Sequence, residues 1–274
     1  MSAMGDLVKA VSWDRYIATL FAPADKREAL FSLYAFDAEV SRICDLVHDP
    51  LPGEIRLQWW RDVANGLRDG EAVGHPVAST LLQTIAAHDL PRGALDAYCE
   101  ARIFEFYHDV MPDQTALEAH LGSTQSMMIQ LAAMVLDRDA ARKVSDAAGH
   151  AGVALGLVDI LRRLPVIRQR GQGFVPQSIL AAVGVSNEIF MGDVDAAAAV
   201  RVTGALSALA GDHWAKYQAL ASTVPKSVRP AFLPVACVPR VLRSVARQSD
   251  PARQMAPISP VLRMWDVMRL AIKG

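Results

Sequence analysis

The helical spacing of apolar residues is the feature that most constrains this chain. Apolar side chains recur three and four residues apart, so they share one face of a helix. Turn-forming sequences such as "DPLPG" at 49–53, "DLP" at 89–91 and "MPD" at 111–113 separate these stretches. No stretch alternates apolar and polar residues as a strand would. The pattern predicts an all-α chain with helices over 26–47, 53–67, 76–87, 92–107, 114–136 and 140–164.

The chain is large enough for one substantial core, because 52% of its 274 residues are hydrophobic. We therefore expect a single domain over 1–274. The formal net charge is −1, which does not indicate a nucleic-acid partner, but the charge is unevenly spread. The segment from residue 213 onward contains ten Lys and Arg but only two acidic residues, which gives it a net charge of +8. The preceding residues therefore carry a net charge of −9. The tail suits an anionic surface or an acidic partner, or it packs against the acidic part of the same molecule.

The last sixteen residues, "SPVLRMWDVMRLAIKG" at 259–274, predict a basic amphipathic helix. Leu262, Trp265, Met268 and Leu270 alternate with Arg263, Arg269 and Lys273. Such a helix can lie on an anionic membrane surface. The alternative is a terminal helix docked on the core.

The three cysteines and the N-terminal sequence indicate the cellular compartment in which we expect the protein. Cys44, Cys99 and Cys237 are widely separated and sit among apolar residues, so we expect reduced core thiols in a cytosolic-type protein. The N-terminus lacks a signal-peptide pattern, and no uncharged apolar run is long enough to span a membrane. We expect a cytoplasmic protein, peripheral at most on the inner face of the membrane.

A first candidate site lies in "SLYAFDAEVSRICDLVHDP" at 32–50. On one continuous helix, Asp37, Ser41 and Asp45 would be four residues apart and share a face. Carboxylates on such a face can bind Mg²⁺ with a substrate phosphate completing its coordination. Two carboxylates separated by a serine make a weak metal face. The alternative is that Arg42 pairs with an acid along the helix.

A second candidate site lies in "GLVDILRRLPVIRQRGQGFVP" at 156–176, where an apolar helix ends in arginines. Asp159 precedes Arg162 and Arg163 by three and four residues, the geometry of a helical salt bridge. We expect Pro165 to end or kink the helix. With these two arginines, Arg168 and Arg170 form a basic collar, which suits an anion and not a divalent cation. Upstream, Gly149, Gly152 and Gly156 predict a small-residue surface for close helix packing.

The first stretch resembles the first motif of the squalene/phytoene synthase family, roughly Y-A-F-x-R-x-x-D-D-x-x-D. "YAFDAEVSRICD" keeps Tyr34 and the third aspartate as Asp45, but the first two aspartates are Ser41 and Arg42. The stretches "GEIRLQWWRD" at 53–62 and "HPVASTLL" at 75–82 are also typical of this family. Glu105 stands where the family has a further aspartate. The resemblance implies an all-α isoprenoid-synthase fold, a helical bundle around a central cavity.

The second stretch resembles the family's second motif, roughly Q-L-T-N-I-L-R-D-V-x-E-D-x-x-x-G-R-x-Y-L-P. Arg162 is kept, and Phe174 stands for the tyrosine. The aspartates of D-x-x-x-D have become Arg163 and Ile167. The resemblance therefore implies a diphosphate–magnesium site whose metal ligands are missing. In the family, Mg²⁺ helps the diphosphate to leave, and such Lewis-acid stabilisation is worth several kcal/mol.

These departures are similar to those in one branch of the family, the mitochondrial assembly factors of respiratory complex I and their proteobacterial relatives. The branch implies a non-catalytic assembly or scaffolding factor whose partner is a complex I subunit or assembly intermediate. It would be a bacterial protein, or a mitochondrial matrix protein if processed. No cofactor is then expected and no residue is assigned as catalytic.

Two alternatives stay open. The chain could be an active synthase that condenses prenyl diphosphates with Mg²⁺, using residual acids at Asp45, Glu105 and Asp159. It could instead bind an isoprenoid or prenyl diphosphate without catalysis. The resemblance places substrate contacts at six positions and the former metal-ligand positions at Ser41, Arg42, Arg163 and Ile167. The six substrate positions are Tyr34, Ser41, Arg42, Arg162, Arg163 and Phe174.

Overall fold

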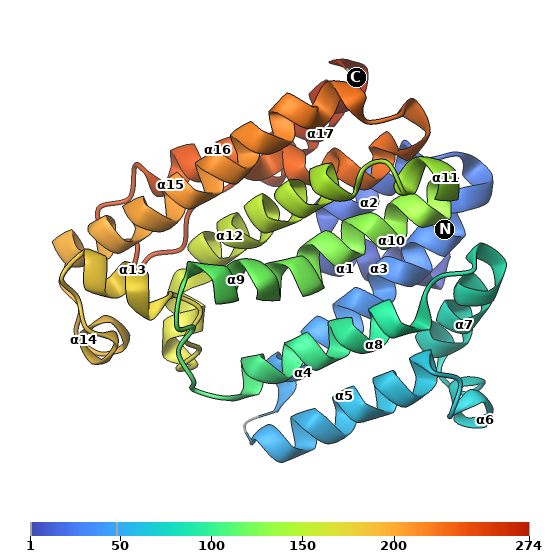
Figure 1. The fold of residues 1–274 in the computed structure, drawn as a ribbon, viewed down its shortest axis with the longest axis horizontal. Helices are drawn as coiled ribbons and strands as arrows, with labels where there is room; N and C mark the ends of the chain where they lie inside the picture. The colour runs from blue at the N-terminus through green and yellow to red at the C-terminus, as the bar shows by residue number, and fades with distance from the viewer. Residues whose placement is uncertain (1, 48, 274) are drawn as a thin grey trace.

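The computed structural model describes residues 2–47 and 49–273, apart from the Lys273 side chain, and it is built of helices (Figure 1). The described residues form no β-strand, only one isolated bridge between Val110 and Gly173. The all-α prediction is therefore confirmed. No helix in the described ranges is both long enough and apolar enough to cross a bilayer.

The elements in the first half of the chain are α1 (Ala3–Val11), α2 (Trp13–Leu20), η1 (Ala24–Lys26), α3 (Arg27–Ser41), α4 (Ile43–Leu46), α5 (Pro50–Ala64), α6 (Asp69–Ala72), α7 (Pro76–His88), α8 (Arg92–Ala101), η2 (Arg102–Phe106), α9 (Gln114–Leu121), η3 (Gly122–Ser126), α10 (Met127–Leu136) and α11 (Arg138–Ala141). The second half contains α12 (Ser145–Gln169), α13 (Gln177–Ala182), α14 (Asn187–Met191), α15 (Ala196–Leu220), η4 (Ala221–Thr223), η5 (Lys226–Cys237), α16 (Val238–Val245) and α17 (Pro260–Lys273).

Local chemistry fixes many of these helix ends. Pro50 and Pro76 begin α5 and α7, where a missing N–H costs nothing because the first turn has no acceptor for it. The Asp113 carboxylate caps α9 by accepting from the Ala116 N–H at 2.9 Å. The Asp195 carboxylate caps α15 in the same way. The starts of α7 and α9 therefore lie where the sequence predicted them, but α5 begins at Pro50, inside the turn expected at 49–53, and not at 53.

Three local predictions need correction. The helix expected over 26–47 is interrupted at Arg42, so α3 and α4 are separate helices. The helix expected over 114–136 contains a π-helical turn at η3, which inserts extra backbone into its middle. Helix α12 continues through Pro165 to Gln169, so the proline does not end the helix, which was one of its two expected effects.

Helix α12 lies at the centre of the fold, packed lengthwise against α15 and also against α10, η3 and α16 (Figure 1). Close approach to η3 depends on glycine. A Cβ placed on Gly152 would lie 2.3 Å from the Ser126 Cα, and one on Gly156 would lie 2.5 Å from a Leu121 methyl carbon. Gly149 has nothing within 4 Å, so the predicted small-residue surface serves close packing at only two of its three glycines.

The C-terminal segment packs back on the N-terminal helices. The proline-rich stretch that follows α15 forms η5, a 3-10 helix of twelve residues that contacts α2, α10 and α17. Helix α17 packs on η5 and α2 and buries Val267 completely. The apolar core is one continuous cluster of side chains that extends from Met4 in α1 to Val267 in α17.

Candidate functional site

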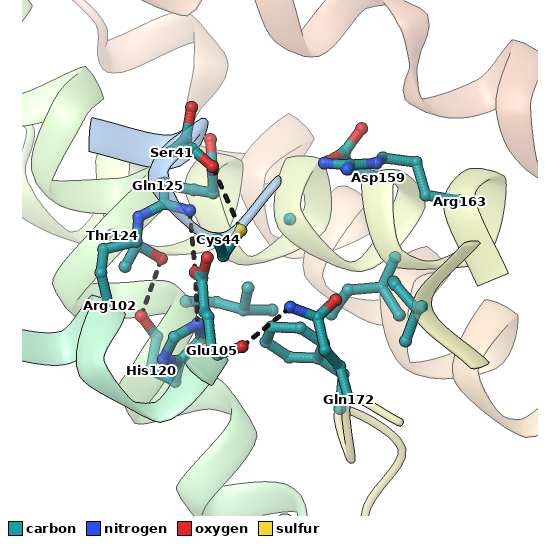
Figure 2. A pocket seen from close by; sticks show the side chains of 15 residues that line it. Ser41, Cys44, Arg102, Glu105, His120, Thr124, Gln125, Asp159, Arg163 and Gln172 are labelled. Atoms are coloured by element: carbon teal, nitrogen blue, oxygen red, sulfur yellow. Dashed lines mark hydrogen bonds and ion pairs between the residues drawn. The ribbon is translucent and has the colours of Figure 1, made fainter. Parts of the chain in front are cut away.

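A small polar cavity lies between the two sequence motifs. Its walls come from α3 and α4 on one side, α12 on another, and η2, α9 and η3 on a third (Figure 2). The free space is about 60 Å³, room for a few water molecules, whereas pockets for drug-sized organic ligands are about 300 Å³ or more. The lining residues are Ser41, Cys44, Arg102, Glu105, His120, Leu121, Thr124, Gln125, Gly156, Asp159, Ile160, Arg163, Ile167, Gln172 and Phe174.

Two clefts adjoin this central cavity. The first shares Asp159 and Arg163 with it and continues toward Arg15 and Arg162. The second shares Glu105 with it and continues toward Asp45 and the end of α12. The three spaces form one polar region that follows both motifs.

A buried ion-pair network supports the wall beneath the cavity. Asp37 of α3 pairs with Arg15 of α2 and accepts a hydrogen bond from the Tyr98 hydroxyl at 2.5 Å. The Arg102 guanidinium donates to that hydroxyl and to Glu105, each at 2.8 Å. At most 11% of each charged side chain is exposed. Two carboxylates and two guanidinium groups thus neutralise one another inside the protein, as buried charges require.

The surroundings of this network fix its protonation state. Burial raises the pKa of Tyr98 to about 12, so its hydroxyl keeps the proton that it donates to Asp37. Burial alone would lower the pKa of Arg102, but the Glu105 carboxylate and the Tyr98 oxygen outweigh it and raise the pKa. Burial lowers the pKa of His120 to about 4, although Glu105 lies 3.7 Å away. His120 is therefore neutral at neutral pH.

The second motif meets the first through arginines. The Arg162 guanidinium lies 2.7 Å from the Asp159 carboxylate, and Arg163 lies 4.0 Å from it, so the predicted helical salt bridge is confirmed. Arg163 also lies 3.6 Å from Asp45, and Arg170 pairs directly with Asp45. Partial burial in the cleft would raise the pKa of Asp159, but Arg162 and Arg163 hold it below its usual value. Guanidinium groups therefore link the two motifs across the cleft.

This arrangement does not fit a magnesium site. Six carboxylates and seven cationic side chains line the three spaces, a net charge of +1. Within the described ranges, no three His, Cys, Asp or Glu side chains are placed to hold one metal ion. A hard divalent cation needs several oxygen ligands and is repelled by guanidinium groups. The carboxylates are Asp14, Asp37, Asp45, Asp49, Glu105 and Asp159, and the cations are Lys9, Arg15, Arg102, Arg162, Arg163, Arg170 and Arg263.

The structure brings some predicted site residues together and leaves others apart. Ser41, Ile167 and Phe174 line the central cavity, and Phe174 packs on His120 with ring centroids 5.5 Å apart. Tyr34 is buried beneath the Arg15 guanidinium and lines none of the three spaces. Arg42 is exposed and makes no ion pair with any described residue, so the expected pairing along the helix is wrong.

Two further predictions about charged side chains are corrected. Asp37 and Asp45 do not share one helix face, because the chain breaks at Arg42 and Asp45 turns to the arginines of α12. Arg168 is not part of the basic collar. Its guanidinium donates to the backbone carbonyls of Phe190, Gly192 and Ala252, where it fixes loops.

The residues missed by sequence reasoning are those with distant partners. Arg15, Tyr98 and Arg102 carry most of the buried network, and Gln172 donates to the Glu105 carbonyl at 3.0 Å. Only the three-residue spacing of Arg102 and Glu105 could have indicated a pair. The Arg15–Asp37 pair joins two helices, and no local pattern marks it.

Comparison with known proteins shows which proteins this chain resembles. A family model described as squalene/phytoene synthase matches residues 8–265. The human protein "NADH dehydrogenase (ubiquinone) complex I, assembly factor 6" is 26% identical over 243 residues, 88% of this chain and 72% of that protein. Presqualene diphosphate synthase of Zymomonas mobilis is 24% identical over 262 residues, 94% of this chain and 88% of the enzyme.

Among solved structures, a dehydrosqualene synthase in complex with a ligand superposes with a TM-score of 0.80. The alignment covers 99% of this chain and 96% of that one at 15% identity. A likeness at this identity establishes the fold alone. The expected bundle architecture is thus confirmed.

Proposed function

The chain belongs to the squalene/phytoene synthase family, and we propose that it is a non-catalytic member that assists assembly of an NADH dehydrogenase (ubiquinone) of the complex I type. The observation that carries the proposal is the pairing of every candidate acid with an arginine. Asp37, Asp45, Glu105 and Asp159 each have a guanidinium partner.

The pairing opposes prenyl-diphosphate chemistry in two ways. When a prenyl diphosphate ionises, its diphosphate leaving group carries several negative charges. Without Mg²⁺ to stabilise them, the activation barrier rises by several kcal/mol. Each increase of about 1.4 kcal/mol lowers the rate about tenfold. The ion pairs of Asp45 with Arg163 and Arg170 also tie α4 to α12. They would have to separate before a substrate with its metal ions could occupy the cleft.

The relatives support the assembly role. Relatives named as complex I assembly factor 6 align over most of this chain, for example 95% for the bovine protein. An assembly factor needs a stable surface for a subunit or an assembly intermediate and needs no catalytic group. Its place would be where those subunits meet the membrane, on the cytoplasmic side in a bacterium or the matrix side in a mitochondrion.

The first test measures chemistry. Purified protein is incubated with farnesyl diphosphate, with and without Mg²⁺, while unfolding temperature and products are followed. We expect no product and no stabilisation that depends on Mg²⁺. A condensed product would establish the synthase alternative, which the similarity to presqualene diphosphate synthase favours. Stabilisation without Mg²⁺ and without product would instead indicate an isoprenoid binder.

A variant that regains the missing metal ligands serves as the positive control for this experiment. Replacing Ser41, Arg42, Arg163 and Ile167 together by aspartate restores carboxylates at the family's ligand positions. We expect this variant to be stabilised by farnesyl diphosphate only when Mg²⁺ is present. The same response in the unmodified protein would contradict the proposal.

The second test measures assembly. The gene is deleted in the source organism, and NADH:ubiquinone oxidoreductase activity and assembled complex are measured in its membranes. We expect both to fall and to recover with the wild-type chain. Asp159→Asn, which removes a half-exposed acid, should restore them equally well because no catalysis is needed. Unchanged complex in the deletion strain would refute the assembly role.

A further inference from the structure

The outward face of α17 is apolar, although solvent-facing sides of docked helices are usually polar. Val261, Leu262, Trp265 and Ile272 are exposed to 66%, 45%, 61% and 80%. At 100° per residue these four positions and Arg269 fall on one stripe of the helix. The stripe contains no acid. Large apolar side chains grouped on an exposed face indicate a binding surface.

The opposite face of α17 holds the helix firmly on the core. Val267 is fully buried, and the Arg263 guanidinium donates to the buried Asp14 carboxylate of α2. Arg240 of α16 donates to Asp266 at 2.8 Å. The orientation of the helix is thus set by ion pairs on its inner side. The apolar stripe faces outward because of this docking.

Unpaired cations flank the stripe. Arg243 of α16 and Arg247, which lies in the turn just after α16, are exposed, and with Met255 and Leu262 they line a groove between α16 and the start of α17. Neither these two arginines nor Arg269 forms an ion pair with a described side chain. We define the α16–α17 surface as Arg243, Arg247, Val261, Leu262, Trp265, Arg269 and Ile272.

We infer that the α16–α17 surface docks on an anionic lipid bilayer. Tryptophan and aliphatic side chains favour the boundary between headgroups and acyl chains, and arginines beside them pair with lipid phosphates. A second copy of this chain fits less well, since a two-fold contact would press together two copies of a surface that carries three arginines and no acid. The inference does not depend on the proposed assembly role, because it rests only on this surface.

The experiment uses the full chain and vesicles of phosphatidylcholine, alone or mixed with phosphatidylglycerol. Co-flotation measures binding, and tryptophan emission reports entry into the interface. We expect binding to the mixed vesicles only, weakening as salt is added. The emission shift should be lost in Trp265→Phe, which keeps an apolar side chain.

Matched variants distinguish vesicle binding by the α16–α17 surface from nonspecific binding by positive charge elsewhere on the protein. An arginine near an anionic surface strengthens binding by about fivefold, so Arg243→Gln with Arg247→Gln should weaken it by about 25-fold. Trp265→Glu should abolish it. The control pair Arg56→Gln with Arg201→Gln removes two exposed arginines of α5 and α15 that form no ion pair with a described residue, and it should change little. Leu67→Glu, at a side chain 73% exposed, is the apolar control.

Several results would overturn the inference. Equal binding to neutral vesicles, or equal loss in the control variants, would show that this surface is not what binds. Dimers in solution that Trp265→Glu dissociates would assign the surface to a second copy. Absence of binding to every vesicle would also overturn it and leave a protein partner. All the replaced side chains are exposed, so unchanged unfolding temperatures verify that each variant is folded.

Discussion

Replacing Gly152 by alanine tests how α12 packs on the π-helical turn. The new Cβ would lie 2.3 Å from the Ser126 Cα and 2.4 Å from its backbone nitrogen, closer than such atoms approach. Both neighbours are backbone atoms, so a side-chain rotation cannot relieve the contact. Either η3 moves away from α12 or the turn changes its hydrogen bonds. Both outcomes alter the wall that carries Gln125 at the central cavity.

The cost follows from two opposed effects. Alanine is better than glycine in a helix by up to about 1 kcal/mol. Overpacking typically costs about 1–3 kcal/mol, and a clash with backbone belongs at the upper end. We therefore expect Gly152→Ala to destabilise the protein by about 2 kcal/mol. For a chain of this size that lowers the unfolding temperature by about 4–8 °C. Thermal and urea unfolding followed by circular dichroism measure it.

Gly149→Ala is the matched control, since it lies one turn earlier on α12 and nothing is within 4 Å of its Cβ position. In this variant alanine's higher helix propensity should act without a steric clash, so the free energy of unfolding should rise by up to about 1 kcal/mol. If Gly152→Ala were as stable as wild type, close contact with Ser126 would not be what holds η3. Equal destabilisation by both variants would show that general helix packing decides the result.

Three further outcomes are expected. Asp37→Asn should cost about 3–5 kcal/mol in urea unfolding, because it leaves the buried Arg15 guanidinium without its carboxylate, whereas the exposed Asp139→Asn should cost almost nothing. The pKa of His120 is lowered from 6.5 to about 4 in the folded state, so the unfolded chain takes up its proton first and stability falls as pH drops from 6.5 toward 4. In His120→Phe the free energy of unfolding should no longer fall by up to about 3 kcal/mol over this pH range. Burial raises the pKa of all three cysteine thiols, so the native protein should react slowly with a thiol reagent at pH 8 and rapidly after unfolding in guanidinium.

The sequence predicted the parts of the fold that depend on local chemistry. Helix starts at Pro76 and after Asp113 follow from residues within one turn, so they could be located in advance. The interruption at Arg42 and the π-helical turn at η3 could not, because they depend on contacts with distant helices. Gly152 shows the difference. Its place in a small-residue surface was visible, but its contact with Ser126 was not.

The same distinction applies to the site. Asp159 and Arg162 are three residues apart, so their ion pair follows from helix geometry alone. Asp45 and Arg170 are 125 positions apart, and only the folded chain brings them together. The resemblance identified where metal ligands are absent. It could not show that arginines of the second motif pair with the acid left in the first.

The contact between Arg263 and Asp14 joins residues 249 positions apart, and this separation affects how the protein is made. During synthesis from the N-terminus, α2 leaves the ribosome long before its partner helix exists. Until α17 arrives, the Asp14 carboxylate stays in water and η5 lacks its cover. Contacts of such long range form slowly, because a large loop must close first. We therefore expect nascent and truncated chains to depend on chaperones, and the outward face of α17 to take its place only in the last step of folding.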